Sequence, residues 1–504
     1  MWELGRVLCV TEQNRGLQEV RVDAQAPLAT ISELSSADRL YRRMTVEALP
    51  VDVLLEIFSF YVDEARDPDG WYPLVHVCRS WRHVVFASPR RLNLRLYCTE
   101  RRPVKKMLDI WPALPIIIWN NVDSPLLVEG AENIIAALEH NDRVSEIVLE
   151  RVPNWLFKRL AAVIEGPFPL LTSLVLLSDD ECGPASVLPE SFLGGSAPRL
   201  LWLKNIPTPV LRKLPLTASD LVNLALWGIP DSAYASPKAM VACLARLTAL
   251  QVLSLRFRSP PNRTSRRPPP LTRVVLPSLI SCDFDGASEY WEDFVAQIDA
   301  PLLDSVDIIF FNQLLFHTPQ FLQFLSRAER LNTINQATVV FLNNMVAIKL
   351  SQKTETVDHT ALSVVIACTQ LDWQLSSLAQ ICVSSLPRLS TLERLVIHEG
   401  RRRPPAWQDD MENSQWLELL QPFTAVKDLY LSKQVELRVA PILQEFCWET
   451  TPEVLPALQN LFLEESQAPE PVQEATGLFA AKRQLGGHPV AIHDWDRGKE
   501  PDYL

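Results

Sequence analysis

The sequence predicts an α/β protein in which a small helical module precedes an irregular solenoid built around a parallel sheet. Of the 504 residues, 47% are hydrophobic, which excludes a wholly disordered chain. Short apolar segments with a period of two recur at similar intervals, as the strands of a repeat array do. Two apolar segments with helical spacing precede the first of these strands.

This pattern divides the chain into four segments. Residues 1–44 are an N-terminal extension that we expect to be partly helical or disordered, and residues 45–90 are the helical module. Residues 91–465 are the repeat solenoid, and residues 466–504 are a C-terminal tail. A repeat array of this length takes the place of separate domains of about 150 residues each.

The helical module begins at Leu49-Pro50, because proline suits the first turn of a helix. The apolar residues that follow recur at helical spacing: Val51, Leu54, Leu55 and Phe58. After a loop rich in Asp and Gly, from Asp63 to Gly70, a second segment repeats apolar residues at intervals of three and four: Leu74, Val77, Trp81, Val84 and Val85. We therefore predict two amphipathic helical segments.

The strand units share the frame Pro-x-Leu-x-x-apolar, usually with a further apolar residue two positions on. Six segments have this frame, with prolines at Pro169, Pro198, Pro277, Pro301, Pro387 and Pro456. Four more keep it without the proline and begin at Val144, Leu221, Leu250 and Val426. A period of two is typical of strands with one buried face, so we predict about ten strand units.

The spacing of these units indicates how they stack. From Val144 to Leu303, successive units begin 21 to 29 residues apart, as in leucine-rich repeats of about 20 to 29 residues. The asparagine of the common leucine-rich consensus is missing: Asp179, Ile229 and Arg258 hold its place in three units. The frame is also blurred between Leu303 and Leu392. There we expect two more strands and a helix, the strands at Ala337-Val339-Phe341 and Leu362-Val364-Ile366 and the helix from Gln320 to Leu331.

The helical module resembles a known family. The run from Leu49 to Phe58, followed by Val77-Cys78-Arg79-Ser80-Trp81, resembles the F-box found in large protein families of mushroom-forming (basidiomycete) fungi, which carry degenerate leucine-rich repeats behind it. The loop between the two helical segments is longer and more acidic here than in compact F-boxes. The resemblance implies that the module binds the Skp adaptor of a cullin RING ubiquitin ligase and that the repeats select the substrate.

Candidate binding residues follow from these two parts. A module of about forty residues with surplus apolar side chains usually donates some of them to a partner. The adaptor-binding candidates are Leu49, Pro50, Leu54, Ile57, Phe58, Val77, Cys78 and Trp81. Of these, Leu54, Ile57 and Trp81 are the expected anchors; alternatively, all three pack against the first repeat. The substrate-face candidates alternate with the buried leucines of the strands: Trp227, Arg256, His398, Tyr430 and Phe462.

Several functional classes are not expected. The sequence has no phosphate-binding, zinc-protease or nucleophile-elbow motif, so we expect no enzyme and no cofactor. His488, His493, Asp494 and Asp496 are ligand-type residues in a polar segment, where solvation is a better explanation than metal binding. A net charge of −12 disfavours nucleic acid. Without a spanning segment or a secretory signal, we expect no membrane association and a cytoplasmic or nuclear location.

Two functions remain. The first is the substrate-recognition subunit of a Skp-cullin-F-box type ubiquitin ligase, with the Skp adaptor, a cullin and a substrate protein as partners. The alternative is a non-catalytic repeat scaffold or interaction protein that acts outside ubiquitin transfer. The run from Arg256 to Pro270 contains five arginines and is expected to be an exposed, polyproline-like loop.

Overall fold

The chain forms two compact units, one ending at Leu92 and one from Asn93 onward. The computed structural model describes residues 49–64, 69–101, 104–120, 128–178, 192–195, 199–204, 219–229, 235–258, 272–311, 316, 318–353, 358–384, 386, 389–401, 404–405, 407, 413–445, 454–464 and 470–497. The expected extension at 1–44 and most of the arginine-rich loop lie outside these residues.

The first unit consists of the short helices α2 (Val51–Glu64), α3 (Tyr72–Val77) and α4 (Arg79–Ala87). The second predicted helical segment is therefore two helices, because Cys78 between them is extended, with φ −157° and ψ 171°. Its sulfur caps α4 by accepting a hydrogen bond from Trp81 N at 3.4 Å. Leu54, Phe58 and Val75 are among the residues of the unit's core.

The second unit is built on one large sheet, whose described strands lie in the order β1-β2-β3-β4-β5-β6-β7-β9-β11-β14-β13-β12-β15-β16-β17-β18. Nearly all neighbouring strands are parallel. The strands are β1 (Leu96–Cys98), β2 (Ile116–Trp119), β3 (Val144–Val152), β4 (Ser173–Ser178), β5 (Trp202–Lys204), β6 (Asn223–Ile229), β7 (Val252–Phe257), β9 (Ser281–Gly286), β11 (Ser305–Phe310), β12 (Gln336–Leu342), β13 (Met345–Lys353), β14 (Asp358–Ala367), β15 (Arg394–Glu399), β16 (Asp428–Leu431), β17 (Asn460–Glu464) and β18 (Ala491–Trp495). A separate parallel pair is formed by β8 (Val274–Val275) and β10 (Ile298–Asp299).

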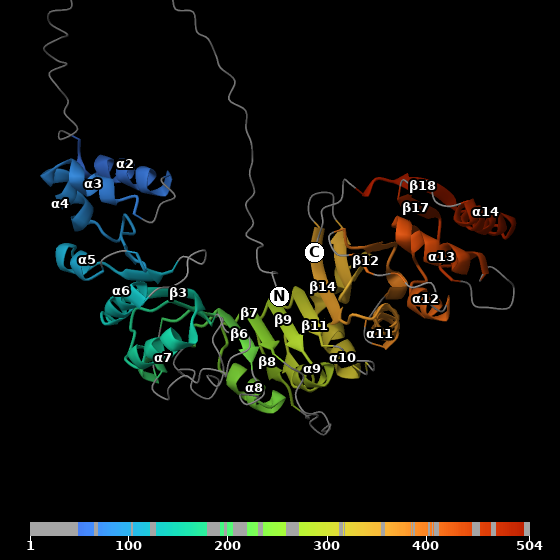
Figure 1. Cartoon of the computed structure of the whole chain (residues 1–504), viewed down its shortest axis with the longest axis horizontal. Helices are drawn as coiled ribbons and strands as arrows, with labels where there is room; N and C mark the ends of the chain where they lie inside the picture. The colour runs from blue at the N-terminus through green and yellow to red at the C-terminus, as the bar shows by residue number, and fades with distance from the viewer. Residues whose placement is uncertain are drawn as a thin grey trace, which may run out of the picture. The chain divides into compact units, whose positions relative to one another are not determined.

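Helices between the strands cover the sheet face to which the leucine-rich frame points. They are α5 (Val104–Ile110), α6 (Val128–Leu138), α7 (Asn154–Val163), α8 (Pro237–Leu244), α9 (Ser288–Val295), α10 (Pro319–Arg327), α11 (Leu371–Ser384), α12 (Asn413–Leu420), α13 (Lys433–Glu445) and α14 (Glu470–Leu485). In Figure 1, α8, α9 and α10 lie along one side of the strands from β6 to β11. On that side Phe284 of β9 packs against Trp291 of α9, with ring centroids 4.9 Å apart.

The α/β prediction is confirmed, and each predicted strand unit coincides with or immediately precedes a strand. The frame residues are buried by the helices; Leu174, Leu253 and Leu255 each have no exposed surface. The helix expected from Gln320 to Leu331 is present as α10 followed by a 3-10 turn, Glu329–Thr333. The frame is blurred between Leu303 and Leu392 because β13 pairs antiparallel with β12 and with β14, which interrupts the parallel order.

The sheet also extends beyond the predicted solenoid end at residue 465. The segment 466–504, expected as a tail, contains α14 and β18. Strand β18 pairs in parallel with β17, placing His493 beside Phe462. The polar character of this segment reflects an exposed strand at the end of the sheet, which sequence periodicity did not distinguish from a tail.

Candidate functional site

Helix α2 has apolar residues on two opposite faces. Leu54, Leu55 and Phe58 point into the first unit and are buried. A second stripe, which we call the outer stripe of α2, comprises Val53, Ile57, Phe60 and Tyr61. These residues are spaced at four, three and one positions and lie on one helix face. Phe60 is 74% exposed and Ile57 47% exposed, so the outer stripe offers apolar area that this unit does not bury.

Contacts around α2 fix its position within the unit. The ring of Phe58 packs against Trp81 of α4 at a centroid distance of 4.7 Å. Arg91 pairs with Glu56 at 2.5 Å and with Asp52 at 3.4 Å. Both carboxylates lie in the first two turns of α2. The helix that carries the outer stripe is therefore fixed by the packing of its core face and by ion pairs near its N-terminus.

The structure divides the predicted adaptor-binding residues into two groups. Ile57, Val77 and Pro50 are exposed, whereas Leu54 and Phe58 belong to the core of the unit. Leu49, Cys78 and Trp81 are partly buried. Three residues of the outer stripe, Val53, Phe60 and Tyr61, were missed by the sequence reasoning. Their spacing from Ile57 was the signal that could have identified them.

In the second unit, the sheet face opposite the helices is called the open face here. On β6 and β7, the guanidinium carbon of Arg256 lies 4.1 Å from the centre of the Trp227 ring. Trp227 Nε1 donates to Ser254 Oγ at 3.0 Å. The two predicted residues are thus in direct contact, and Ser254 beside them is buried although it lies on the open face.

Acidic residues continue the open face on the next strands. Asp283 and Asp285 of β9 pair in register with Ser254 and Arg256 of β7, and Asp307 of β11 lies beside Asp283. Burial raises the pKa of Asp285 to about 6, and the Arg256 charge acts in the opposite direction. Burial also raises the pKa of Asp283, and the charge of Asp307 adds to that rise. A cationic ligand group at this position would stabilise the ionised carboxylates.

A second cluster on the open face is aromatic and lies on the last strands. The ring of Tyr430 stacks on Phe462 with a centroid distance of 4.2 Å and an angle of 3°. Phe462 in turn stacks on His493 at 4.9 Å. Arg394 covers the Tyr430 ring, with its guanidinium carbon 4.0 Å from the ring centre. Tyr430 is only 9% exposed, so the more accessible part of this cluster is at Phe462 and His493.

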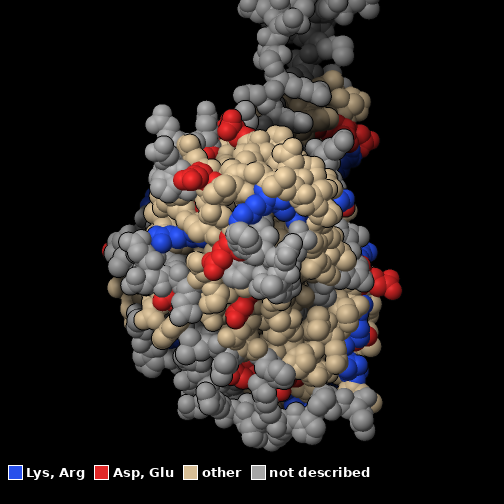
Figure 2. Space-filling view, turned by 90° about the vertical axis from the view of Figure 1, so that its right-hand side faces the viewer, with Lys and Arg blue, Asp and Glu red and all other residues tan. Residues whose placement is uncertain are grey.

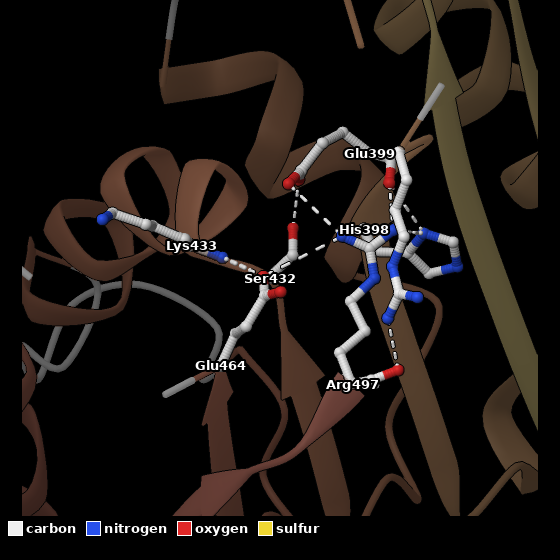
Figure 3. A network of polar contacts seen from close by, with 7 residues as sticks. His398, Glu399, Ser432, Lys433, Glu464 and Arg497 are labelled. Carbon is white, nitrogen blue, oxygen red and sulfur yellow. Dashed lines mark hydrogen bonds and ion pairs between the residues drawn. The ribbon is translucent and has the colours of Figure 1, made fainter. Parts of the chain in front are cut away.

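His398 lies in a polar network at the ends of β15, β16 and β17 (Figure 3). The buried guanidinium of Arg497 places Nη2 2.9 Å from His398 Nδ1 and Nη1 3.4 Å from Glu399 Oε1. Ser432 Oγ donates to the Glu399 carboxylate, and Lys433 N donates to Glu464 Oε2 at 3.0 Å. These contacts join three strands to the C-terminal segment, which gives His398 a structural role within the described residues.

The described residues offer no group of three or more His, Cys, Asp or Glu side chains arranged to hold a metal ion. Of the four ligand-type residues near the C-terminus, His493 stacks on Phe462 and its Nε2 lies 3.3 Å from Asn460 Oδ1. Within the described part of the chain, no helix combines the length and the hydropathy that a membrane crossing requires.

The structure consists of a small helical module followed by a large, mostly parallel α/β sheet. Residues 46–95 match the F-box-like family. The match covers α2, α3 and α4 and extends a few residues beyond the predicted boundary at residue 90. No curated protein matches the chain. The N-terminal module is thus supported as an F-box by its sequence match and by its helices, whereas a leucine-rich-repeat relationship of the sheet and a fungal source stay predictions.

Proposed function

We propose that this chain is the substrate-recognition subunit of a Skp-cullin-F-box type ubiquitin ligase. The observation that carries the proposal is the outer stripe of α2, which lies inside the segment that matches the F-box-like family. Fully burying an apolar side chain of this size contributes about 1.5–3 kcal/mol, and the four residues of the stripe, which are 42–74% exposed, can each contribute part of that to a helix-mediated contact. Their partner in this proposal is the Skp adaptor.

The open face is the proposed substrate surface. Trp227 and Arg256 are in direct contact on it, and Asp283, Asp285 and Asp307 add negative charge to the neighbouring surface. Such a receptor catalyses nothing itself and raises the local concentration of a bound substrate near the conjugating enzyme. The chemistry of the reaction belongs to the other subunits of the ligase.

Affinity purification of the full chain tests the adaptor contact. We expect the wild-type chain to bring down both the Skp adaptor and a cullin. Substituting Ile57→Ala together with Phe60→Ala is expected to weaken adaptor binding at least tenfold and to leave thermal unfolding nearly unchanged, because both side chains are already exposed. The matched control is Ile110→Ala on α5, where a residue that is 71% exposed lies outside the F-box-like segment.

Two outcomes would change this conclusion. Adaptor binding without a cullin would favour a scaffold that acts outside ubiquitin transfer. Full adaptor binding by the double variant would remove the outer stripe of α2 as the docking surface. Leu54→Ala also lowers binding in this proposal, but through unfolding of the unit, which circular dichroism separates from the loss of a contact.

A further inference from the structure

Strand β18 is the last strand of the sheet, and among the described residues its strand neighbour is β17 alone. Ala491 N donates to Gln459 O at 2.8 Å. Because hydrogen-bonding directions alternate along a parallel ladder, the backbone groups of Ile492 and Asp494 point away from β17. Ala491 to Asp494 are exposed, and Ile492 is 45% exposed. Figure 2, which faces this end of the molecule, shows uncharged residues over most of the described surface.

The aromatic stack on the open face reaches the same edge. Tyr430, Phe462 and His493 occupy paired positions on β16, β17 and β18, so each strand adds one ring. Arg394 covers the inner end of the stack at Tyr430. The Asn460 side chain, through its contact with Nε2, helps to hold the ring of His493. His493 is exposed, so the face of its ring that does not contact Phe462 forms the open end of the stack.

We propose that β18 is a docking edge for an extended segment of a partner protein, which adds a strand beside β18 and places an aromatic side chain on His493. Neighbouring strands lie about 4.8 Å apart, close to the ring spacings of 4.2 and 4.9 Å in the stack. A side chain paired with His493 therefore continues the stack without rearrangement. Main-chain hydrogen bonds provide affinity in this binding mode, and side chains provide selectivity.

A second copy of the chain fits this edge less well. Two-fold antiparallel pairing of β18 centred on His493 would stack the two His493 rings, but it would set Ile492 opposite Asp494 of the other copy and Asp494 opposite its Ile492, so both flanking pairs place an apolar side chain beside a charged one. A partner segment with an aromatic residue has no such mismatch. The proposal does not depend on adaptor binding or on ubiquitin transfer.

The test uses the full chain and a fluorescent seven-residue probe, Thr-Val-Thr-Phe-Thr-Val-Thr. We expect saturable binding by fluorescence anisotropy, and binding three- to tenfold weaker when alanine replaces the phenylalanine of the probe. Ile492→Pro removes an outward N–H while keeping the bonds to β17, so it is expected to weaken binding at least tenfold. Ile492→Ala keeps that N–H and is the matched control. His493→Ala is expected to weaken binding three- to tenfold, and His493→Phe to preserve it.

A probe methylated on alternate backbone nitrogens gives the same test without changing the protein, because it cannot pair with a strand edge. The proposal is overturned if the unmodified probe shows no saturable binding or if methylation has no effect. It is also overturned if the free chain is a dimer that Ile492→Pro dissociates, since a second copy then occupies the edge. Protection of the Ile492 and Asp494 amides from hydrogen exchange before the probe is added would show that the chain itself covers the edge.

Discussion

Arg256 shows how one residue links neighbouring strands of the open face. It lies over the Trp227 ring on one side and beside Asp285 on the other. Leu255, the preceding residue, points to the opposite face and is completely buried. The alternation of side chains along β7 therefore separates a structural position from a candidate binding position by a single residue.

This alternation predicts opposite effects at Leu255 and Arg256. Leu255→Ala leaves a cavity in the core and should lower the free energy of unfolding by about 2–5 kcal/mol. Arg256→Ala removes a cation–π contact with Trp227 and a counter-charge to Asp285, so it should cost about 1 kcal/mol at neutral pH, less than Leu255→Ala, and weaken binding of the proposed substrate. Urea unfolding of both variants measures the difference. Equal destabilisation would show that β7 does not have one buried face.

Asp285 predicts a dependence of stability on pH. Its pKa rises from 3.8 to about 6 on folding because of burial, so the folded state favours the protonated form. The resulting stabilisation is fully present below pH 3.8 and is lost as the pH rises through about 6. Asparagine is neutral at both pH values, whereas Asp285 is ionised at pH 7.5. Asp285→Asn should therefore stabilise the folded chain relative to wild type by about 1–3 kcal/mol at pH 7.5 and by almost nothing at pH 3.5. Denaturant unfolding at the two pH values gives this difference, and a constant difference would contradict the assignment.

At the scale of elements, strand β9 ends in a tightly packed aromatic cluster. A Cβ atom at Gly286 would lie 2.8 Å from the Phe284 ring and 2.9 Å from the Phe257 ring. These rings are themselves packed together, with centroids 5.8 Å apart, and both contact Tyr290 of α9. The glycine is therefore required by the space between the strand and its helix.

Gly286→Ala should accordingly destabilise the second unit by about 1–3 kcal/mol, because rings in a packed cluster must move to admit a methyl group. Thermal unfolding of the full chain checks the expected loss. Gly477→Ala is the control, since a Cβ atom there meets nothing within 4 Å and alanine is the better helix former in α14. If both variants had the same stability, the close packing at Gly286 would not be confirmed.

The elements that the sequence predicted are those whose burial follows a simple period. Leu253 and Leu255 are conspicuous because helices cover one face of each parallel strand. The antiparallel strand β13 has no proline or leucine frame, and β18 is mostly exposed, so neither shows the repeat signal. The outer stripe of α2 was only partly recognised, because Leu54 and Phe58 alternate with it and both sets are apolar. Deciding which set faces the core required the positions of Trp81 and the other helices.

At the scale of the whole molecule, the sheet is held together by contacts between successive strands. If the sheet is the predicted repeat array, its stability comes from each unit and from the interface with its neighbour. The polar network around Arg497 joins β15, β16 and β17 to the C-terminal segment and so stabilises the last strands of the sheet. Disrupting this network is expected to destabilise those strands and to leave the distant strands unchanged.

Arg497→Ala tests this locality. Its loss leaves Glu399 and Glu464 without a buried cation, which should cost about 3–5 kcal/mol within the last strands of the sheet. Hydrogen exchange should therefore become faster in β15, β16 and β17 and stay unchanged in β4, β6 and β7. The control is Lys427→Ala, which removes an exposed ion pair to Glu393 at 2.6 Å in the same region and should cost no more than about 1 kcal/mol. Faster exchange throughout the sheet would show that the second unit unfolds as one cooperative body, because an array coupled only between neighbours would confine the effect to the strands that Arg497 joins.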